Sequence, residues 1–294
     1  MTQIAANQIV SWRDYYQMCK PRVVMLMILT SMVGMFLAVP GMVALDILIL
    51  GNLGIALVCS AGAVVNHLID RKVDSLMKRT HNRPIPQGKI DPRQAAIFAA
   101  MIGTLGMAIL LLWVNPLCAW LTLASFVGYA IIYTGYLKRA TPQNIVIGGL
   151  SGAMPPLLGW SAVSGTIDPN ALILVLIIFA WTPPHFWALA IHRKEEYAKS
   201  GIPMLPVTHG IHVTKVHIVL YTILLIMVSI FPYLTGMSGP LYLLAAVILG
   251  AGFMVWSLLL MFKQKPTTAM DTFRYSLIYL CVLFPTLLVD HYLF

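Results

Sequence analysis

Apolar and polar residues alternate along this chain in long blocks, without the short periods of soluble helices and strands. Nine blocks of about 20 mostly apolar residues are each long enough to cross a hydrocarbon core of about 30 Å as a helix. Polar turns or longer charged stretches separate the blocks. The pattern predicts an all-α integral membrane protein with about nine transmembrane helices. The predicted spans are 21–40, 45–66, 93–113, 117–136, 143–163, 171–191, 213–233, 240–262 and 273–291.

The composition leaves no room for a separate soluble domain. Hydrophobic residues make up 59% of the 294 and charged residues 10%, whereas a soluble domain carries about 25% charged residues. We expect an N-terminal interfacial tail over 1–20, which mixes aromatic and basic residues, and a single transmembrane domain over 21–294. The four cysteines are scattered without ligand-type spacing, so we expect them to be apolar helix residues.

The basic residues predict the orientation in the membrane. All 19 Lys and Arg residues fall in the N-terminal tail, in the connections that follow the second, fourth, sixth and eighth spans, or at the span ends beside them. The positive-inside rule places that side in the cytoplasm, with the C-terminus on the opposite side. Because topology accounts for the net charge of +9, we expect no nucleic-acid partner. The lack of a transit peptide favours a bacterial plasma membrane.

The stretch "NHLIDRKVD" places hard oxygen ligands at the cytoplasmic end of the second span. Asn66, Asp70 and Asp74 recur every four residues, so they share one helix face. Two carboxylates and an amide oxygen suit Mg²⁺, which binds one or two carboxylates together with substrate phosphates. The alternative is that the carboxylates only form ion pairs at the membrane surface with Arg71, Lys72 or Lys78.

Basic residues follow this acidic face directly. Lys78, Arg79 and Arg83 lie in the next connection, and Lys138 and Arg139 lie after the fourth span. Carboxylates that hold a divalent cation beside such groups suit a polyanion such as diphosphate. The alternative is that these charges only anchor the cytoplasmic side.

A second polar set lies at the end of the sixth span. His192 and Glu196 each fall within about 20° of His185 around a helix. An ionisable group within an apolar span is a functional candidate, and imidazole and carboxylate can ligate a metal. Alternatively, His185 bonds to a neighbouring helix, and Glu196 pairs with Arg193 or Lys199.

Aromatic and small residues mark the fourth and fifth spans. Tyr129, Tyr133 and Tyr136 predict either an interfacial aromatic belt or a pocket wall for an electron-poor intermediate. The stretch "GGLSGAMPPLLGW" favours close helix packing with a kink at the proline pair.

These motifs together resemble the UbiA superfamily of membrane prenyltransferases. "NHLIDRKVD" matches the superfamily's NxxxDxxxD motif. "MKRTHNRPIP", "LKRATPQNIVIGGLSGAMPPLLGW" and "PPHFWALAIHRKEEYAKSGIPMLP" are similar to the branch that transfers a farnesyl group to haem. The resemblance runs from about Lys20 to the last span. It departs from the general pattern at the second DxxxD motif, where this chain has His192 and Glu196.

The resemblance implies a Mg²⁺-dependent transfer of farnesyl from farnesyl diphosphate to a vinyl group of haem b, with water addition, giving haem O. It implies a bilayer location, and haem A synthase or haem–copper oxidase assembly proteins as partners. Together with the reasoning above it yields these expected roles: catalysis by Asp70, Asp74, Tyr133 and His192; diphosphate binding by Lys78, Arg79, Arg83, Lys138 and Arg139; haem binding by His185 and His192; metal binding by Asn66, Asp70, Asp74 and Glu196.

Three other functions compete with this interpretation. A related enzyme with another acceptor, such as a quinone precursor, would share the acid motif, although the histidines of the sixth span argue against it. A transporter would place polar groups at mid-membrane or on both faces, whereas here they gather at one end. A non-catalytic scaffold would give no reason for two polar sets that each share one helix face.

Overall fold

The computed structural model of the chain describes residues 10–263, 265 and 267–293, and no strand occurs among them. The predicted all-α membrane architecture is therefore confirmed. Residues 1–9 of the predicted tail, and residues 264, 266 and 294 of the predicted transmembrane domain, lie outside the described residues. The helices are α1 (Trp12–Met18), α2 (Pro21–Leu37), α3 (Leu45–Asp74), α4 (Pro92–Ile109), η1 (Leu110–Val114), α5 (Pro116–Phe126), η2 (Val127–Leu137), α6 (Lys138–Ala140), α7 (Asn144–Ala153), α8 (Pro155–Ser164), α9 (Pro169–His192), α10 (Lys194–Lys199), α11 (Leu205–Thr208), α12 (Gly210–Ser229), α13 (Phe231–Leu234), α14 (Pro240–Phe262) and α15 (Thr268–Leu293).

The described helices agree with the nine predicted spans. Eight straight or gently bent stretches are long and apolar enough to cross a membrane. A ninth arises when α1 and α2, which meet at a bend of 52°, are counted as one span. The protein is thus an integral, multi-pass membrane protein.

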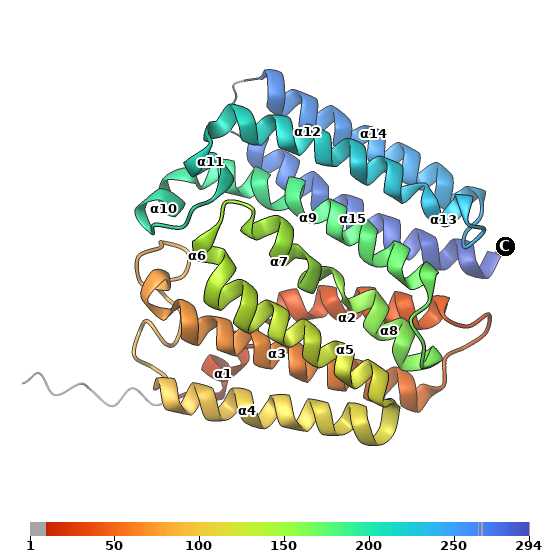
Figure 1. Ribbon diagram of the computed structural model, residues 1–294, viewed down its shortest axis with the longest axis horizontal. Helices are drawn as coiled ribbons and strands as arrows, with labels where there is room; N and C mark the ends of the chain where they lie inside the picture. Colours follow the sequence, from red (N-terminus) through yellow and green to blue (C-terminus); the bar gives the residue numbers. More distant parts are fainter. Residues whose placement is uncertain (1–9, 264, 266, 294) are drawn as a thin grey trace, which may run out of the picture.

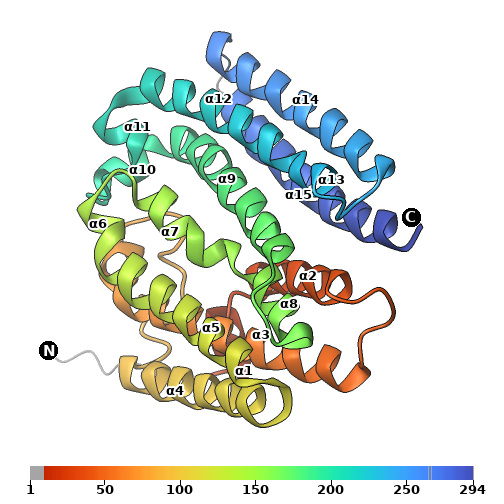
Figure 2. The same cartoon turned by 45° about the vertical axis from the view of Figure 1, so that its right-hand side comes forward.

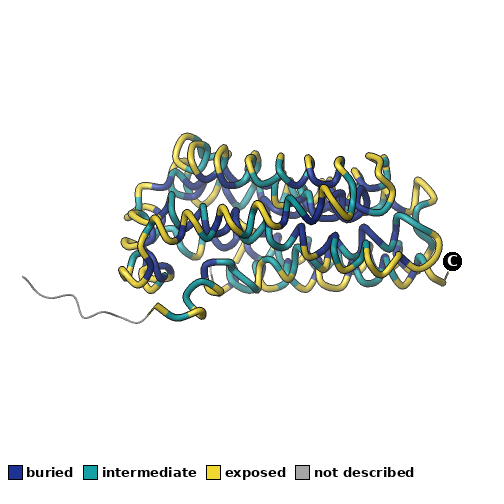
Figure 3. Tube along the Cα trace, turned by 90° about the horizontal axis from the view of Figure 1, so that it is seen from below, coloured by how far each residue is buried: buried dark blue, intermediate teal, exposed yellow. Residues whose placement is uncertain are grey.

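The long helices lie side by side in one tilted bundle (Figure 1). α3 packs on α4 at one side, α12 packs on α14 at the other, and α2, α8, α9 and α15 lie between them. The view turned by 45° shows the same order (Figure 2). Buried positions line the inside of the bundle and exposed positions its outside (Figure 3). Since many exposed side chains are large and apolar, the outer surface suits a lipid environment.

Small residues bring α2 and α8 into close contact. A Cβ atom added to Gly34 would lie 2.1 Å from the carbonyl oxygen of Pro156, and one added to Gly159 would lie 1.9 Å from that of Ser31. Only glycine allows the two backbones to approach this closely. The packing interpretation of the fifth span is confirmed. Its proline pair also separates α7 from α8, because α8 begins at Pro155.

Two local features differ from the predicted spans. α3 continues to Asp74 instead of ending at residue 66, because its backbone hydrogen bonding continues beyond the apolar part. The fourth span contains an eleven-residue π-helical segment, η2. Both affect the site, since they carry the acid motif and the aromatic motif. α9, in contrast, passes through Pro183 and Pro184 without ending, in agreement with the sixth predicted span.

The polar connections gather at one end of the bundle. The segment between α3 and α4, helix α6, helices α10 and α11, and the connection between α14 and α15 all lie at this end, and the end of α15 lies at the other (Figures 1 and 2). We call it the basic end. It brings together Lys and Arg residues that are more than 100 positions apart in the sequence.

Candidate active site

The acid motif forms one continuous helix face near the basic end. Asn66, Asp70 and Asp74 all belong to α3 and are 5%, 0% and 3% exposed. We call these three residues the acid triad. Asn66 Nδ2 donates to Asp70 Oδ2 at 2.9 Å and to Thr134 Oγ1 at 3.1 Å, which links α3 to the π-helical segment. Buried carboxylates need compensating partners, so the surrounding residues decide what this face does.

Three of the five predicted diphosphate-binding residues contact the acid triad directly. Lys138 Nζ lies 2.5 Å from Asp70 Oδ2, and Arg139 lies 3.4 Å from the other oxygen of Asp70. Arg83 lies 2.6 Å from Asp74. The structure thus joins the connection after α3 to the end of the fourth span, which the sequence could only place on the same side of the membrane.

Lys78 and Arg79 are placed differently. Both are exposed, and neither side chain forms an ion pair among the described residues. They lie in the same short connection as Arg83, at the basic end. Their role in binding diphosphate therefore stays a prediction.

Lys20 belongs to the same cluster, and sequence reasoning missed it. Its ammonium donates to Asn66 Oδ1 at 2.5 Å and to the Tyr129 hydroxyl at 3.3 Å. The residue precedes α2 and has a left-handed backbone with φ of 51°, a conformation shared by no other non-glycine residue among those described. The ammonium is partly buried, so an anion at this position would offset the cost of removing its charge from water.

The signal that could have identified Lys20 is the dipeptide Lys20–Pro21. Proline occupies the first position of α2 and fixes where that helix begins. The residue before a proline is restricted away from the helical region. This restriction disfavours one continuous helix through Lys20, and α1 and α2 meet there at a bend of 52°.

The π-helical segment supplies an aromatic wall beside the acid triad. The rings of Tyr129 and Tyr133 are stacked with centroids 6.0 Å apart and planes 21° apart. Tyr133 packs closely on Gly148, where a Cβ atom would lie 2.1 Å from its ring. π-helical turns frequently occur at functional sites. Tyr136, by contrast, is 69% exposed, so it faces outward as an interfacial residue would.

His67 is a second residue that sequence reasoning missed. It is buried beside Asn66 on α3, and neither ring nitrogen has a hydrogen-bond partner among the described residues. It precedes Asp74 by seven residues and therefore shares a helix face with it. The quoted stretch "NHLIDRKVD" contained this residue, but its spacing matched no ligand pattern.

His185 lies in the core and away from solvent. Its Nδ1 is 2.6 Å from the hydroxyl of Ser276 on α15, and its ring stacks on Trp181 and Phe273. These contacts agree with the alternative interpretation, in which His185 bonds to a neighbouring helix. The structure gives this imidazole a packing role, and its predicted role toward haem is untested.

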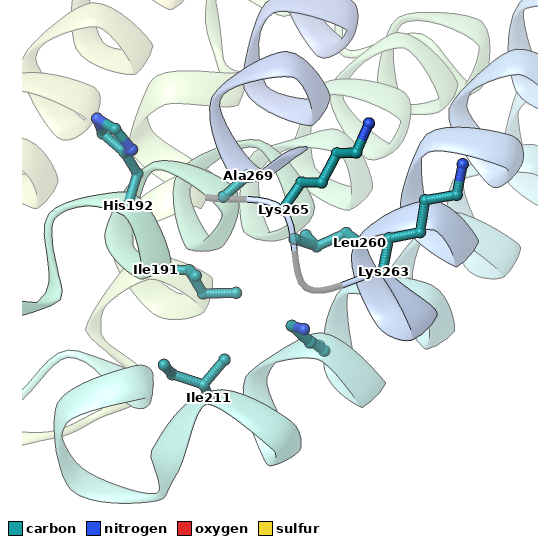
Figure 4. Close-up of a pocket in the computed structure, with 8 residues that line it drawn as sticks. Ile191, His192, Ile211, Leu260, Lys263, Lys265 and Ala269 are labelled. Atoms are coloured by element: carbon teal, nitrogen blue, oxygen red, sulfur yellow. The ribbon is translucent and has the colours of Figure 1, made fainter. Parts of the chain in front are cut away.

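Among the described residues, neither His192 nor Glu196 forms an ion pair with the acid triad. His192, at the end of α9, lines a separate pocket at the basic end, where its ring points away from Lys263 (Figure 4). Glu196 pairs with Arg193 at 3.7 Å, as the alternative proposed. Among the described residues, no three His, Cys, Asp or Glu side chains converge as metal ligands. The predicted metal set of Asn66, Asp70, Asp74 and Glu196 therefore stays a prediction.

Comparison with known proteins identifies the fold and the family. The model of the UbiA prenyltransferase family matches residues 27–280. This chain belongs to that family. It is a membrane prenyltransferase, and the resemblance seen in the motifs is confirmed.

Similar relatives cover almost the whole chain. Protoheme IX farnesyltransferase of Saccharophagus degradans is 63% identical over 99% of this chain and 96% of its own length. The protein of the same name from Stutzerimonas stutzeri is 61% identical over 96% and 95%. Both comparisons extend from end to end, so they include the acid triad and the second polar set.

Solved structures share the fold at low sequence identity. A digeranylgeranylglyceryl phosphate synthase superimposes with a TM-score of 0.81 at 20% identity, over 96% of this chain and 99% of that one. A UbiA homologue from Archaeoglobus fulgidus bound to GPP and Mg²⁺ gives 0.64 at 17% identity, over 93% and 99%. These likenesses establish the bundle architecture of this UbiA family member.

The acid triad has the donor chemistry that Mg²⁺ requires. Two carboxylates and one amide oxygen are hard ligands, and they leave positions for water or phosphate oxygens. Lys20, Arg83, Lys138 and Arg139 occupy these oxygens as hydrogen-bond donors in the structure. A divalent cation would take their place, and the released donors would then suit an anionic partner.

Proposed function

We propose that this chain transfers the farnesyl group of farnesyl diphosphate to a vinyl group of haem b. The carbon–oxygen bond at C1 of farnesyl breaks, diphosphate leaves with the bonding pair, and a carbon–carbon bond forms to the vinyl group. Water then adds to the resulting haem cation and releases a proton, which gives the hydroxyethylfarnesyl group of haem O. The reaction occurs at the acid triad in the presence of Mg²⁺.

The names of the relatives and the solved ligands support the two substrates. Relatives about 60% identical over nearly their full length are named protoheme IX farnesyltransferase. Solved UbiA homologues have been obtained with GPP or DMAPP together with Mg²⁺. Prenyl diphosphate, a divalent cation and haem are therefore the ligands we assign to this chain.

One observation carries the proposal: four cations surround a buried face of two carboxylates and an amide. Lys20, Arg83, Lys138 and Arg139 come from three separate parts of the chain, and each contacts a member of the acid triad. A purely structural ion-pair network would need no such excess of positive charge. A diphosphate with its divalent cation would balance that excess.

The residues have distinct tasks in this proposal. Asn66, Asp70 and Asp74 would hold Mg²⁺, which supplies charge neutralisation at the leaving diphosphate. Lys138, Arg83 and the other cations bind the diphosphate oxygens, with Lys78 and Arg79 reaching in from the adjacent connection. We expect the stacked faces of Tyr129 and Tyr133 to stabilise positive charge at C1 and to exclude stray water.

We assign the binding of the acceptor, haem b, to the second polar set of His185, His192 and Glu196. His192 is exposed whereas His185 is locked in the core, so we propose His192 as the imidazole that meets haem or moves a proton. Glu196 would act as a further metal ligand only after its pair with Arg193 opens. We place the site toward the cytoplasm of a bacterial plasma membrane, on the basis of the one-sided basic residues.

Product mass analysis tests the acceptor. The purified chain is incubated with farnesyl diphosphate and Mg²⁺, together with either haem b or 4-hydroxybenzoate. We expect haem to gain one farnesyl group plus one water, and 4-hydroxybenzoate to remain unchanged. Prenylation of 4-hydroxybenzoate with unchanged haem would identify the quinone-precursor alternative and refute the proposal.

A further inference from the structure

A pocket of about 460 Å³ lies at the basic end, among α9, α12, α14 and α15 (Figure 4). Of its lining residues, only His192 has a role in the reaction proposed above. Its apolar lining consists of Ile191, Ile211, Leu260 and Ala269, and its charged lining consists of Lys215, Lys263 and Lys265, with His192 at one edge. We call it the lysine pocket.

The lysines of this pocket have no acidic partners. Among the described residues, none of the three ammonium groups forms an ion pair, and the acidic residue that follows in sequence, Asp271, pairs with Arg274. Lys263 and Lys265 extend in the same direction from the connection between α14 and α15 (Figure 4). Three like charges among the lining residues, without acidic partners, favour an anionic ligand.

The pocket lies at the end of an apolar outer surface. α12 and α14 pack on each other and expose large apolar side chains along their lengths. In a membrane protein these positions face lipid chains. The exposed residues include Leu220, Ile223 and Met227 on α12, and Leu244, Ile248 and Phe262 on α14.

We propose that the lysine pocket binds the phosphate headgroup of an anionic phospholipid whose acyl chains lie along α12 and α14. Basic pockets between transmembrane helices at a membrane surface have the charge that such headgroups need. A soluble anion would use the lysines but not the apolar lining or the adjoining surface. The proposal concerns a surface outside the acid triad and does not depend on the proposed reaction.

Lipid titration of the full-length chain in detergent tests this site. Native mass spectrometry measures the bound fraction of phosphatidylglycerol, of phosphatidylcholine and of inorganic phosphate. Each lysine contributes a factor of about five to the affinity for an anionic lipid. The double variant Lys215→Gln/Lys263→Gln should therefore weaken phosphatidylglycerol binding about 25-fold.

Matched variants separate a site from general attraction. Lys89→Gln/Lys199→Gln removes the same charge from exposed positions outside the pocket, and it should change phosphatidylglycerol binding less than about twofold. Lys215→Arg/Lys263→Arg should retain binding, which shows that a loss in the glutamine variant is not a folding defect. Equal losses in both glutamine variants, equal binding of phosphatidylcholine, or equal binding of inorganic phosphate would overturn the proposal.

Discussion

Replacing Lys138 with glutamine should change the affinities of the acid triad for Mg²⁺ and for diphosphate in opposite directions. In the structure, the Lys138 ammonium lies 2.5 Å from Asp70 Oδ2, and the two side chains are only 16% and 0% exposed. A Mg²⁺ ion that binds Asp70 must displace this ammonium. Diphosphate, in contrast, offers the displaced ammonium a new partner.

The size of the effect follows from the burial of this pair. A charge-assisted hydrogen bond contributes about 1.5–3 kcal/mol, which corresponds to about 10- to 100-fold in affinity. Lys138→Gln should therefore strengthen the binding of Mg²⁺ alone by up to that factor. It should weaken the binding of inorganic diphosphate in the presence of Mg²⁺ by a similar factor.

Arg139 provides a matched control on the same carboxylate. Arg139→Gln removes the same charge, but its contact with Asp70 is longer, at 3.4 Å, and its side chain is 45% exposed. Exposed pairs contribute about 0–1 kcal/mol, so either affinity should change less than about fivefold. Isothermal titration with Mg²⁺ alone, and then with diphosphate in the presence of Mg²⁺, measures both affinities for each variant and for the unchanged chain. Weaker Mg²⁺ binding by Lys138→Gln, or equal effects of the two variants, would refute the reasoning.

Three further predictions follow from the packing. Gly159→Ala should lower the free energy of unfolding by about 1–3 kcal/mol because its Cβ meets the backbone of α2; Gly152→Ala, where nothing lies within 4 Å, is the control, and equal Tm values would contradict this. Asp290→Ala should lower the free energy of unfolding by about 1–3 kcal/mol, because the Asp290 carboxylate accepts hydrogen bonds from the backbone amides of Gly239 and Tyr242 at the start of α14. An unchanged unfolding midpoint would show that these hydrogen bonds do not stabilise the helix. His185→Ala should lower stability by about 3 kcal/mol while absorbance titration shows unchanged haem binding; lost haem binding at unchanged stability would identify an iron ligand instead.

The acid triad could be predicted from sequence because its geometry is local. Residues four apart on a helix share a face whatever the rest of the chain does. Asn66, Asp70 and Asp74 therefore needed only the assumption that α3 continues past its apolar part, which it does. The number of spans was predictable for a similar reason, since the bilayer thickness sets the length of each apolar block.

Contacts between helices could not be read from the sequence in this way. The pairing of Asp70 with Lys138 joins positions 68 residues apart, and the charge pattern placed both only at the same membrane surface. Lys20 was missed because its role depends on a left-handed backbone before Pro21. The pairing of Glu196 with Arg193 was one of two pairings that the sequence left open, because helix spacing alone does not decide between neighbouring cations.

Turnover by Asp70→Asn tests the central claim, that the acid triad activates the diphosphate, most directly. The variant keeps the size of a side chain that is 0% exposed but removes its charge. With farnesyl diphosphate, haem b and Mg²⁺, we predict that formation of farnesylated haem falls at least about 100-fold, while haem binding is unchanged. Full activity of this variant would contradict the account.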